Sequence, residues 1–226
     1  MRPAGTSPAP RVTESSVAEN RPVPLRFETE PMGDAGLLVT VPEGQAPEAY
    51  RRLAAAGLSG VRDVVPAARS VLVVFEDGET VDEGALASAL SGEAPAGEER
   101  ARVVEVPVRY DGADLADAAR RAGLTPAEFA ARHASAEYVV AFVGFRPGFP
   151  YLRGLPPELA TPRLATPRPR VPAGSVAIGA GWSGIYPAAT PGGWNLIGTT
   201  DLVLFDAART PPALFAPGDR VRFVRA

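Results

Sequence analysis

The chain has 226 residues, of which 46% are apolar and 22% charged, as is typical of a globular protein with one large domain or two small ones. Its net charge of −3 argues against a nucleic-acid partner, because nucleic-acid-binding domains carry an excess of basic residues. The sequence has no cysteine and a single histidine, His133, which excludes cysteine-ligated metal and argues against a zinc site. We therefore expect this chain to bind neither nucleic acid nor a metal ion.

The first 23 residues are rich in Pro, Ser and Ala, and such a segment buries too little apolar surface to offset the entropy of ordering. It contains neither a long apolar run nor the basic and apolar regions of a signal peptide. The sequence therefore predicts a disordered tail over residues 1–23, and a cytoplasmic protein with no membrane partner.

Residues 24–97 predict a small α+β domain. Thr80 and Glu83 have the spacing of a capping box, and Gly57 has the place of a left-handed helix end. Short β-branched runs on either side of the first helix predict strands. In chain order we expect two strands, a helix, two strands and a helix, at residues 25–32, 37–41, 47–60, 61–67, 70–76 and 80–92.

The segment 91–100 is rich in Gly, Pro and Glu and has no apolar periodicity, which is typical of a linker. We place the domain boundary between residues 97 and 98. Beyond it the sequence predicts a strand at 102–110 and two helices at 112–124 and 125–134.

The second of these helices has a complete start signal. Thr125 has the N-cap position, Pro126 follows it, and Glu128 completes a capping box. From Tyr138 onward, short β-branched and aromatic runs alternate with Pro and Gly breaks, which is typical of a closed β-barrel. The expected barrel strands lie at residues 138–145, 175–178, 184–187, 194–198, 201–206 and 220–224.

Three motifs stand out in this second domain: GFRPGFPYL at 144–152, TPRLATPRPRVPAGSVAI at 161–178, and GIYPAATPGGWNLIG at 184–198. In this order they resemble the family known as carboxyltransferase subdomain C and D, whose members are called allophanate hydrolase subunit 1, the B subunit of 5-oxoprolinase or Kip-type kinase inhibitor. The Gly33-Asp34 turn and the segment LFAPGDRVRFV at 214–224 are similar to its N-terminal and C-terminal motifs. The resemblance covers nearly the whole chain after the tail.

The resemblance implies an α+β fold in which a small ferredoxin-like domain at residues 24–97 precedes a cyclophilin-like β-barrel domain at residues 98–226. It also implies a non-autonomous subunit of an ATP-dependent 5-oxoprolinase, which converts 5-oxoproline to glutamate. Its partners would be the carboxyltransferase-like C subunit of 5-oxoprolinase and the A subunit. ATP with magnesium then belongs to the complex, because this chain has no P-loop, dinucleotide fingerprint or kinase motif.

Two other functions stay open at this point. One is inhibition of a sensor histidine kinase through a protein-docking surface on the barrel, and the other is a subunit of an allophanate hydrolase or urea carboxylase system. A serine hydrolase is excluded, since His133 is the only histidine available as a base and no Gly-x-Ser-x-Gly elbow occurs.

Arg163 and Arg168 lie in a repeated Thr-Pro-Arg pattern. Proline stiffens the loop, so two guanidinium groups would be presented to a carboxylate or phosphate at low entropic cost. The alternative is that both are solvated loop charges or bind carbonyls and interface carboxylates. His133, near the end of its helix, fits a structural role, and family members often carry a histidine there. These three are the candidate catalytic residues.

The candidate substrate-binding residues come from the three motifs. Aromatic residues beside Pro and Gly breaks line a cleft or fill the core, and a Gly pair permits close approach of a ligand or forms a tight hairpin. A serine after glycine forms part of an anion-binding turn or satisfies local backbone groups. The set comprises Phe149, Tyr151, Ser175, Ser183, Tyr186, Gly192, Gly193 and Trp194.

The chain departs from the family pattern at two places. The family commonly has Gln-Thr before the Gly-Ile-Tyr-Pro motif, whereas this chain has Trp182 and Ser183. A common Gly-Arg-Thr also appears here as Gly198-Thr199-Thr200. These departures affect any substrate contact that is transferred through Trp182 or Thr199.

Overall fold

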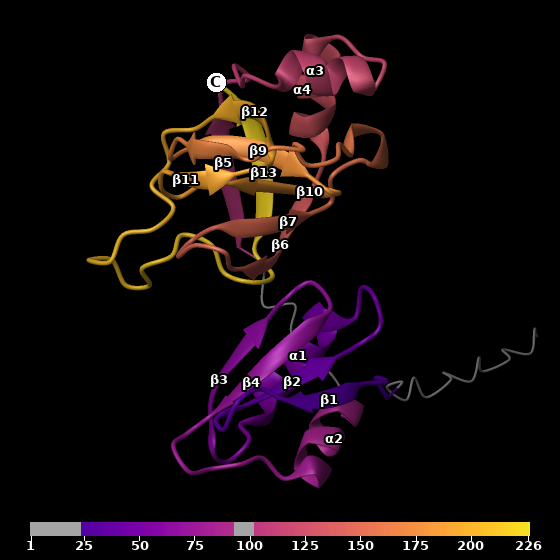
Figure 1. Cartoon of the computed structure of the whole chain (residues 1–226), viewed down its shortest axis with the longest axis vertical. Coiled ribbons are helices and arrows are strands. Elements are labelled where there is room, and N and C mark those ends of the chain that lie inside the picture. The colour runs from indigo at the N-terminus through magenta and orange to yellow at the C-terminus, as the bar shows by residue number, and fades with distance from the viewer. Residues whose placement is uncertain (1–23, 93–101) are drawn as a thin grey trace, which may run out of the picture.

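The computed structural model describes residues 24–92 and 102–226, and Figure 1 shows two units that each contain their own sheet. We call residues 24–92 the first unit and residues 102–226 the second unit. Their buried apolar residues form separate clusters, each within one unit. The predicted tail at residues 1–23 and the predicted boundary between residues 97 and 98 lie outside the described residues.

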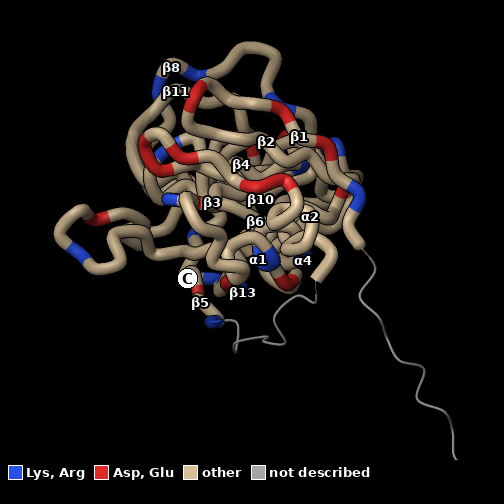
Figure 2. The backbone as a smooth tube through the Cα atoms, turned by 90° about the horizontal axis from the view of Figure 1, so that it is seen from below, with Lys and Arg blue, Asp and Glu red and all other residues tan. Residues whose placement is uncertain are grey.

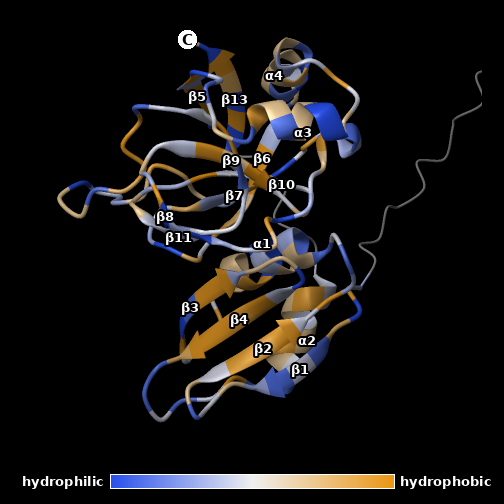
Figure 3. Cartoon of the chain, turned by 45° about the horizontal axis from the view of Figure 1, so that its top comes forward, coloured by the Kyte–Doolittle hydropathy of each residue, from blue (hydrophilic) through white to orange (hydrophobic). Residues whose placement is uncertain are grey.

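The first unit is a four-stranded antiparallel sheet with two helices. In strand β4, Val71, Val73 and Phe75 are buried and alternate with half-buried residues, because successive side chains point to opposite faces of a strand. In Figure 3 the apolar colouring follows β2, β3 and β4, whereas the edge strand β1 is hydrophilic. The elements are β1 (Glu28–Pro31), β2 (Gly36–Thr40), α1 (Ala46–Ala56), β3 (Val61–Pro66), β4 (Ser70–Phe75) and α2 (Glu83–Ser91), and the sheet order is β1-β2-β4-β3.

A ferredoxin-like unit runs βαββαβ, whereas the first unit runs ββαββα. Strand β1, the first in the chain, lies at the sheet edge beside β2. The mixed α/β character is confirmed, and the ferredoxin-like assignment stays a prediction.

The helix ends test three predictions about caps. Helix α1 ends at Ala56, and its C-cap Gly57 has a left-handed φ of 56°, as predicted. The predicted capping box at Thr80 and Glu83 is wrong, because α2 begins at Glu83 and Asp82 is its N-cap, accepting a hydrogen bond from the Gly84 amide. The capping box of Thr125 and Glu128 is confirmed.

The second unit contains a seven-stranded sheet that nearly closes into a barrel. Its order is β12-β9-β10-β7-β6-β13-β5, and the two ends meet where Arg109 and Thr199 exchange backbone hydrogen bonds of 2.9 and 2.8 Å. Strands β8 and β11 pair separately. The elements are β5 (Val103–Val108), α3 (Leu115–Arg121), α4 (Pro126–Ser135), β6 (Tyr138–Val143), β7 (Pro150–Arg153), the 3-10 helix η1 (Pro157–Leu159), β8 (Arg168–Val171), β9 (Ser175–Gly179), β10 (Trp182–Ile185), β11 (Thr190–Gly192), β12 (Asn195–Thr199) and β13 (Arg220–Arg225).

The predicted strand at 201–206 is wrong. This segment leaves the sheet after β12 and makes only an isolated bridge between Phe205 and Ala213. Of its apolar residues, Leu204 is buried in the core of the second unit. Among the described residues, Val203 and Phe205 are exposed.

Alternation along β7, β9, β10 and β12 separates two hydrophobic clusters. One contains Leu152, Val176 and Ile185 and belongs to the same core as Phe129 of α4. The other contains Ala177 on the opposite face of β9, with Phe149 and Trp194 directly before β7 and β12. The second cluster is where the cavity described below lies. None of the helices in residues 24–92 and 102–226 has the length and apolar content to span a membrane.

Candidate functional site

The motif residues of the second unit line a cavity of about 230 Å³. Its walls come from three segments that are distant in the sequence: the loop before β7, the loop between η1 and β8, and the chain from β10 to β12. The lining residues are Phe145, Phe149, Tyr151, Arg163, Pro167, Tyr186, Pro191, Gly192, Gly193 and Trp194. Six of the eight predicted substrate-binding residues are among them, together with Arg163. Their role in binding stays a prediction.

Trp194 forms one wall, and glycines make room for its indole. A Cβ atom at Gly179 would lie 2.9 Å from the indole Cγ, and one at Gly184 would lie 3.0 Å from its Cζ3. The ring meets Tyr151 edge to face at 5.6 Å between centroids. These small residues of β9 and β10 therefore set how deeply Trp194 lies.

Tyr186 lies in contact with Gly192. A Cβ atom at Gly192 would lie 2.4 Å from the Tyr186 hydroxyl, whereas one at Gly193 would meet nothing closer than 3.6 Å. Tyr186 is buried, with its ring edge to face against Phe149 at 5.2 Å. Burial raises the pKa of its hydroxyl, and a backbone hydrogen bond at Trp194 and the nearby Arg163 act in the opposite direction.

This contact predicts that Gly192→Ala destabilises the protein while Gly193→Ala does not. The added methyl group at 192 overlaps an enclosed tyrosine, and overpacking of this kind costs about 1–3 kcal/mol. Urea unfolding of the two variants measures the difference, with Gly193→Ala as the matched control. Equal free energies of unfolding for both variants would contradict this contact between Tyr186 and Gly192.

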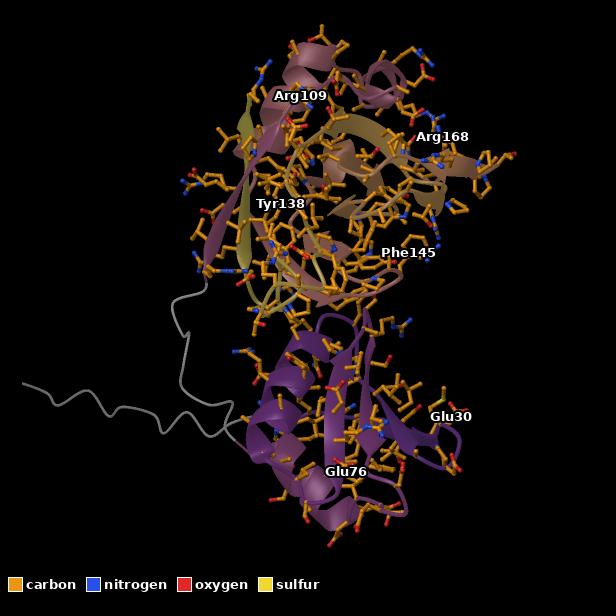
Figure 4. The ribbon with its side chains drawn as sticks, turned by 90° about the vertical axis from the view of Figure 1, so that its left-hand side faces the viewer. Glu30, Glu76, Arg109, Tyr138, Phe145 and Arg168 are labelled. Carbon is orange, nitrogen blue, oxygen red and sulfur yellow. The ribbon has the colours of Figure 1, made fainter. Side chains whose placement is uncertain are left out.

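Phe145 lies at the mouth of the cavity in a strained conformation. Its φ of 65° is left-handed, which is uncommon for a bulky residue and concentrates at functional sites. Its side chain is 58% exposed and meets Phe149 edge to face at 5.5 Å. The loop is held by the Arg146 Nε, which donates to the Thr190 hydroxyl at 3.2 Å. Figure 4 shows Phe145 at the end of the second unit nearer to the first.

Arg163 is the only charged side chain among the described residues that line the cavity. Burial raises the pKa of the Tyr151 hydroxyl as well, and the Arg163 cation again opposes this rise. The cavity thus combines one guanidinium group with two phenols and apolar walls. Such a combination is chemically suited to a small, partly apolar anion.

Arg168 does not line the cavity. Its Nη2 donates to the Asp114 carboxylate at 2.6 Å, so one of the two predicted anion-binding arginines already has a carboxylate partner within the chain. Ser175 is likewise outside the cavity lining and donates to the Pro172 carbonyl at 2.8 Å. That bond fits the turn-stabilising alternative.

His133 lies in the core, apart from the cavity. It is fully buried, and its two ring nitrogens lie 2.8 Å from the Tyr110 hydroxyl and 2.9 Å from the Ser183 hydroxyl. Burial lowers the pKa of the imidazole to about 3. Ser183 belongs to the same buried chain of hydrogen bonds, so the structure groups these two predicted site residues with each other and away from Arg163.

Phe145, Pro167 and Pro191 line the cavity but were not among the predicted site residues. Pro167 and Pro191 lie within two of the three motifs, and that position was the available signal. The left-handed backbone conformation of Phe145 could not be predicted, because phenylalanine rarely adopts it. No group of three or more His, Cys, Asp or Glu side chains within residues 24–92 and 102–226 is arranged to hold a metal ion. In Figure 2, basic and acidic segments are interspersed along the chain.

Comparisons with known proteins agree with the motifs. The family model described as carboxyltransferase domain, subdomain C and D, matches residues 27–215. The B subunit of 5-oxoprolinase from Escherichia coli is 47% identical over 172 residues, which cover 74% of this chain and 79% of that protein. The B subunit of 5-oxoprolinase from Bacillus subtilis is 45% identical over 127 residues, which cover 55% of this chain and 53% of that protein.

Solved structures share the fold. The crystal structure of the protein TTHA0988 matches with a TM-score of 0.73 and 42% identity, covering 84% of this chain and 40% of that one. The urea carboxylase of Kluyveromyces lactis matches with a TM-score of 0.65 at 19% identity, covering 92% of this chain and 23% of that one. This second likeness concerns the fold alone.

Proposed function

The chain belongs to the family described as carboxyltransferase domain, subdomain C and D, and on that premise we propose that it is a subunit of a 5-oxoprolinase. With the A and C subunits of that enzyme, it takes part in the ATP-dependent opening of 5-oxoproline to glutamate in the cytoplasm. Within this proposal the first unit is ferredoxin-like and the second is a cyclophilin-like barrel. The names of the curated relatives support the proposal.

The observation that carries the proposal is the cavity with Arg163 at its wall. 5-Oxoproline is a small, flat lactam with one carboxylate. A guanidinium group suits the carboxylate, because its planar donors match two carboxylate oxygens. The rings of Trp194 and Tyr151 provide flat apolar walls for the lactam ring. At about 230 Å³, the cavity lies below the range of roughly 300–1,000 Å³ of pockets for drug-sized ligands.

The cavity binds and orients but lacks the groups for the chemistry. Its lining contains no carboxylate, histidine or serine among the described residues, and burial raises the pKa of its two phenols, Tyr151 and Tyr186. It therefore offers no ready general base or nucleophile at neutral pH. Magnesium prefers carboxylate oxygens and phosphates, and the described residues present no acidic cluster of that kind. Because the described lining of the cavity carries no carboxylate at all, the cavity itself does not fit ATP with magnesium, and we assign the nucleotide to the partner subunits.

Because the nucleotide and the groups for the chemistry are assigned to the partner subunits, we predict that the isolated chain is catalytically silent. Purified alone, it should release no glutamate from 5-oxoproline in the presence of ATP and magnesium. Combined with the A and C subunits from the same genome, it should restore ATP-dependent glutamate release. The matched control is the mixture of those two subunits without this chain. Turnover by the single chain, or equal turnover by the control mixture, would contradict the proposal.

A further inference from the structure

Asp114 makes long-range contacts where its sequence position suggests a local one. It is the N-cap of α3, a position at which aspartate usually accepts hydrogen bonds from its own helix, yet its side chain makes no such bond. Instead, Oδ1 accepts from Arg168 Nη2 at 2.6 Å and Oδ2 accepts from the Leu196 amide at 2.7 Å. Asp114 is only 8% exposed. One buried carboxylate therefore joins the start of α3 to β8 and β12.

Both partners of Asp114 lie next to the cavity wall. Arg168 pairs with Gly192 in the ladder between β8 and β11. Leu196 belongs to β12 and lies two residues after Trp194, which directly precedes this strand. The segment 192–196, which carries Gly192, Gly193 and Trp194 of the cavity, is thus held at both ends by contacts that converge on Asp114.

The hydrogen bond from the Leu196 amide to Asp114 forms where the regular pairing of β12 with β9 is interrupted. The register between β12 and β9 shifts between Leu196 and Gly198. The backbone amide of Asp114 also donates to the Leu196 carbonyl at 2.9 Å. The loop before α3 lies directly against β12, because a Cβ atom at Gly112 would be 2.3 Å from the Leu196 carbonyl oxygen. Asp114 is therefore fixed in place and can fix its partners.

We propose that Asp114 and Arg168 are positioning residues, which hold the segment 192–196 so that Trp194 and Gly192 form the cavity wall. Arg168 acts through Asp114 and Gly192, and Arg163 is the arginine that faces the ligand. The statement about ligand affinity rests on the proposed function. The statement about the position of Trp194 does not.

The pair is expected to act as a unit. Removing Arg168 leaves the buried carboxylate of Asp114 without its counterpart, a cost that is absent when both are removed. Removing Asp114 leaves Arg168, whose side chain is 28% exposed, without its carboxylate. The effects of single substitutions at 114 and 168 should therefore not add in the double variant. Two unrelated surface charges would instead give additive and small effects.

Trp194 provides a spectroscopic readout of the proposal. The chain has two tryptophans, so a Trp182→Phe background leaves Trp194 as the only indole. In the full chain with this background, we expect Asp114→Asn and Arg168→Met each to increase acrylamide quenching of Trp194. Arg168→Lys should increase it less, because lysine keeps the charge but loses the fork of donors. In the reconstituted complex, each of the first two variants should weaken 5-oxoproline binding by up to roughly tenfold, because the cavity wall loses the support of the charge-assisted hydrogen bond between Arg168 and Asp114.

The matched control is Asp201→Asn. Asp201 accepts two hydrogen bonds from Arg109 at 2.7 and 3.0 Å, but it is exposed and does not line the cavity. Arg109 and Arg168 lie apart on the second unit in Figure 4. This control should leave both the quenching of Trp194 and the affinity for 5-oxoproline unchanged.

The outcomes separate the two proposals. Increased quenching of Trp194, with non-additive effects in the double variant, supports the positioning role. This holds even if the parent complex binds no 5-oxoproline. Failure of the parent complex to bind 5-oxoproline would overturn only the proposed function. Unchanged quenching in folded Asp114→Asn, or strictly additive effects, overturns the positioning role. If Asp114→Asn fails to fold, Arg168→Lys decides: quenching and affinity equal to those of the parent overturn the role, and intermediate values support it.

Discussion

Arg163→Lys is expected to lower the turnover or affinity of the reconstituted complex for 5-oxoproline roughly tenfold to a hundredfold, while assembly stays intact. Lysine keeps the positive charge but loses the planar pair of donors that a carboxylate accepts from arginine. Loss of a charge-assisted hydrogen bond costs about 1.5–3 kcal/mol, which corresponds to this range. Glutamate release as a function of 5-oxoproline concentration measures the effect.

Arg170→Lys is the matched control for this experiment. Arg170 comes from the same Pro-rich segment and is exposed, but it does not line the cavity. Its substitution should leave turnover and affinity unchanged. If Arg163→Lys also assembles and turns over like the parent, Arg163 is a surface charge and the ligand is not bound through it. If assembly itself fails at Arg163→Lys alone, the residue belongs to an interface with a partner.

We also expect the free energy of unfolding to fall at acidic pH because of His133. His133 is buried without charge, and its folded-state pKa is about 3, whereas a histidine in an unfolded chain has a pKa of about 6.5. Between these values the unfolded state binds more protons than the folded state, so the free energy of unfolding falls as pH falls. This single group should remove about 2 kcal/mol between about pH 7 and about pH 5.

His133→Gln isolates this contribution. Glutamine does not titrate, and His133 is the only histidine in the chain, so the variant should lose much less stability over the same pH range. A lower free energy of unfolding at neutral pH does not affect the test, because the comparison concerns the slope with pH. Urea unfolding at several pH values gives both slopes. Parallel slopes for parent and variant would show that His133 titrates normally and is not enclosed as described.

Local signals in the sequence predicted local structure well when they were complete. The capping box of Thr125 and Glu128 has both partners at the correct spacing, and α4 begins there. Thr80 and Glu83 have the same spacing, but Asp82 lies between them and caps α2 instead. Spacing alone does not decide which of several capping residues the helix uses. Leu86 and Leu90 belong to the hydrophobic core of the first unit, and their packing fixes which face of α2 is buried.

The cavity was partly predictable because its residues lie in motifs rich in Gly, Pro and aromatic residues. Phe149, Tyr186 and Trp194 needed no knowledge of the fold to be chosen. The distinction between Arg163 and Arg168 was not predictable, since their sequence contexts are nearly the same. It depends on Asp114, which lies 54 residues from Arg168 in the chain.

The contacts of His133 and Asp114 were also not predictable from the sequence. Which face of α4 meets the sheet decides that His133 joins Ser183 in the core, and a helix end alone does not reveal that face. Asp114 has the sequence position of an ordinary N-cap, and its contact with Leu196 depends on how the barrel closes. Contacts between distant segments are therefore where sequence reasoning ends.

The most direct test of the account is a crystal structure of the complex reconstituted from this chain and the A and C subunits, with 5-oxoproline and a non-hydrolysable ATP analogue. We predict that 5-oxoproline lies in the cavity, with its carboxylate within hydrogen-bonding distance of the Arg163 guanidinium group and its ring against Trp194. The nucleotide should lie on the partner subunits. A well-ordered 5-oxoproline bound elsewhere, with this cavity empty or filled by a partner side chain, would contradict the account.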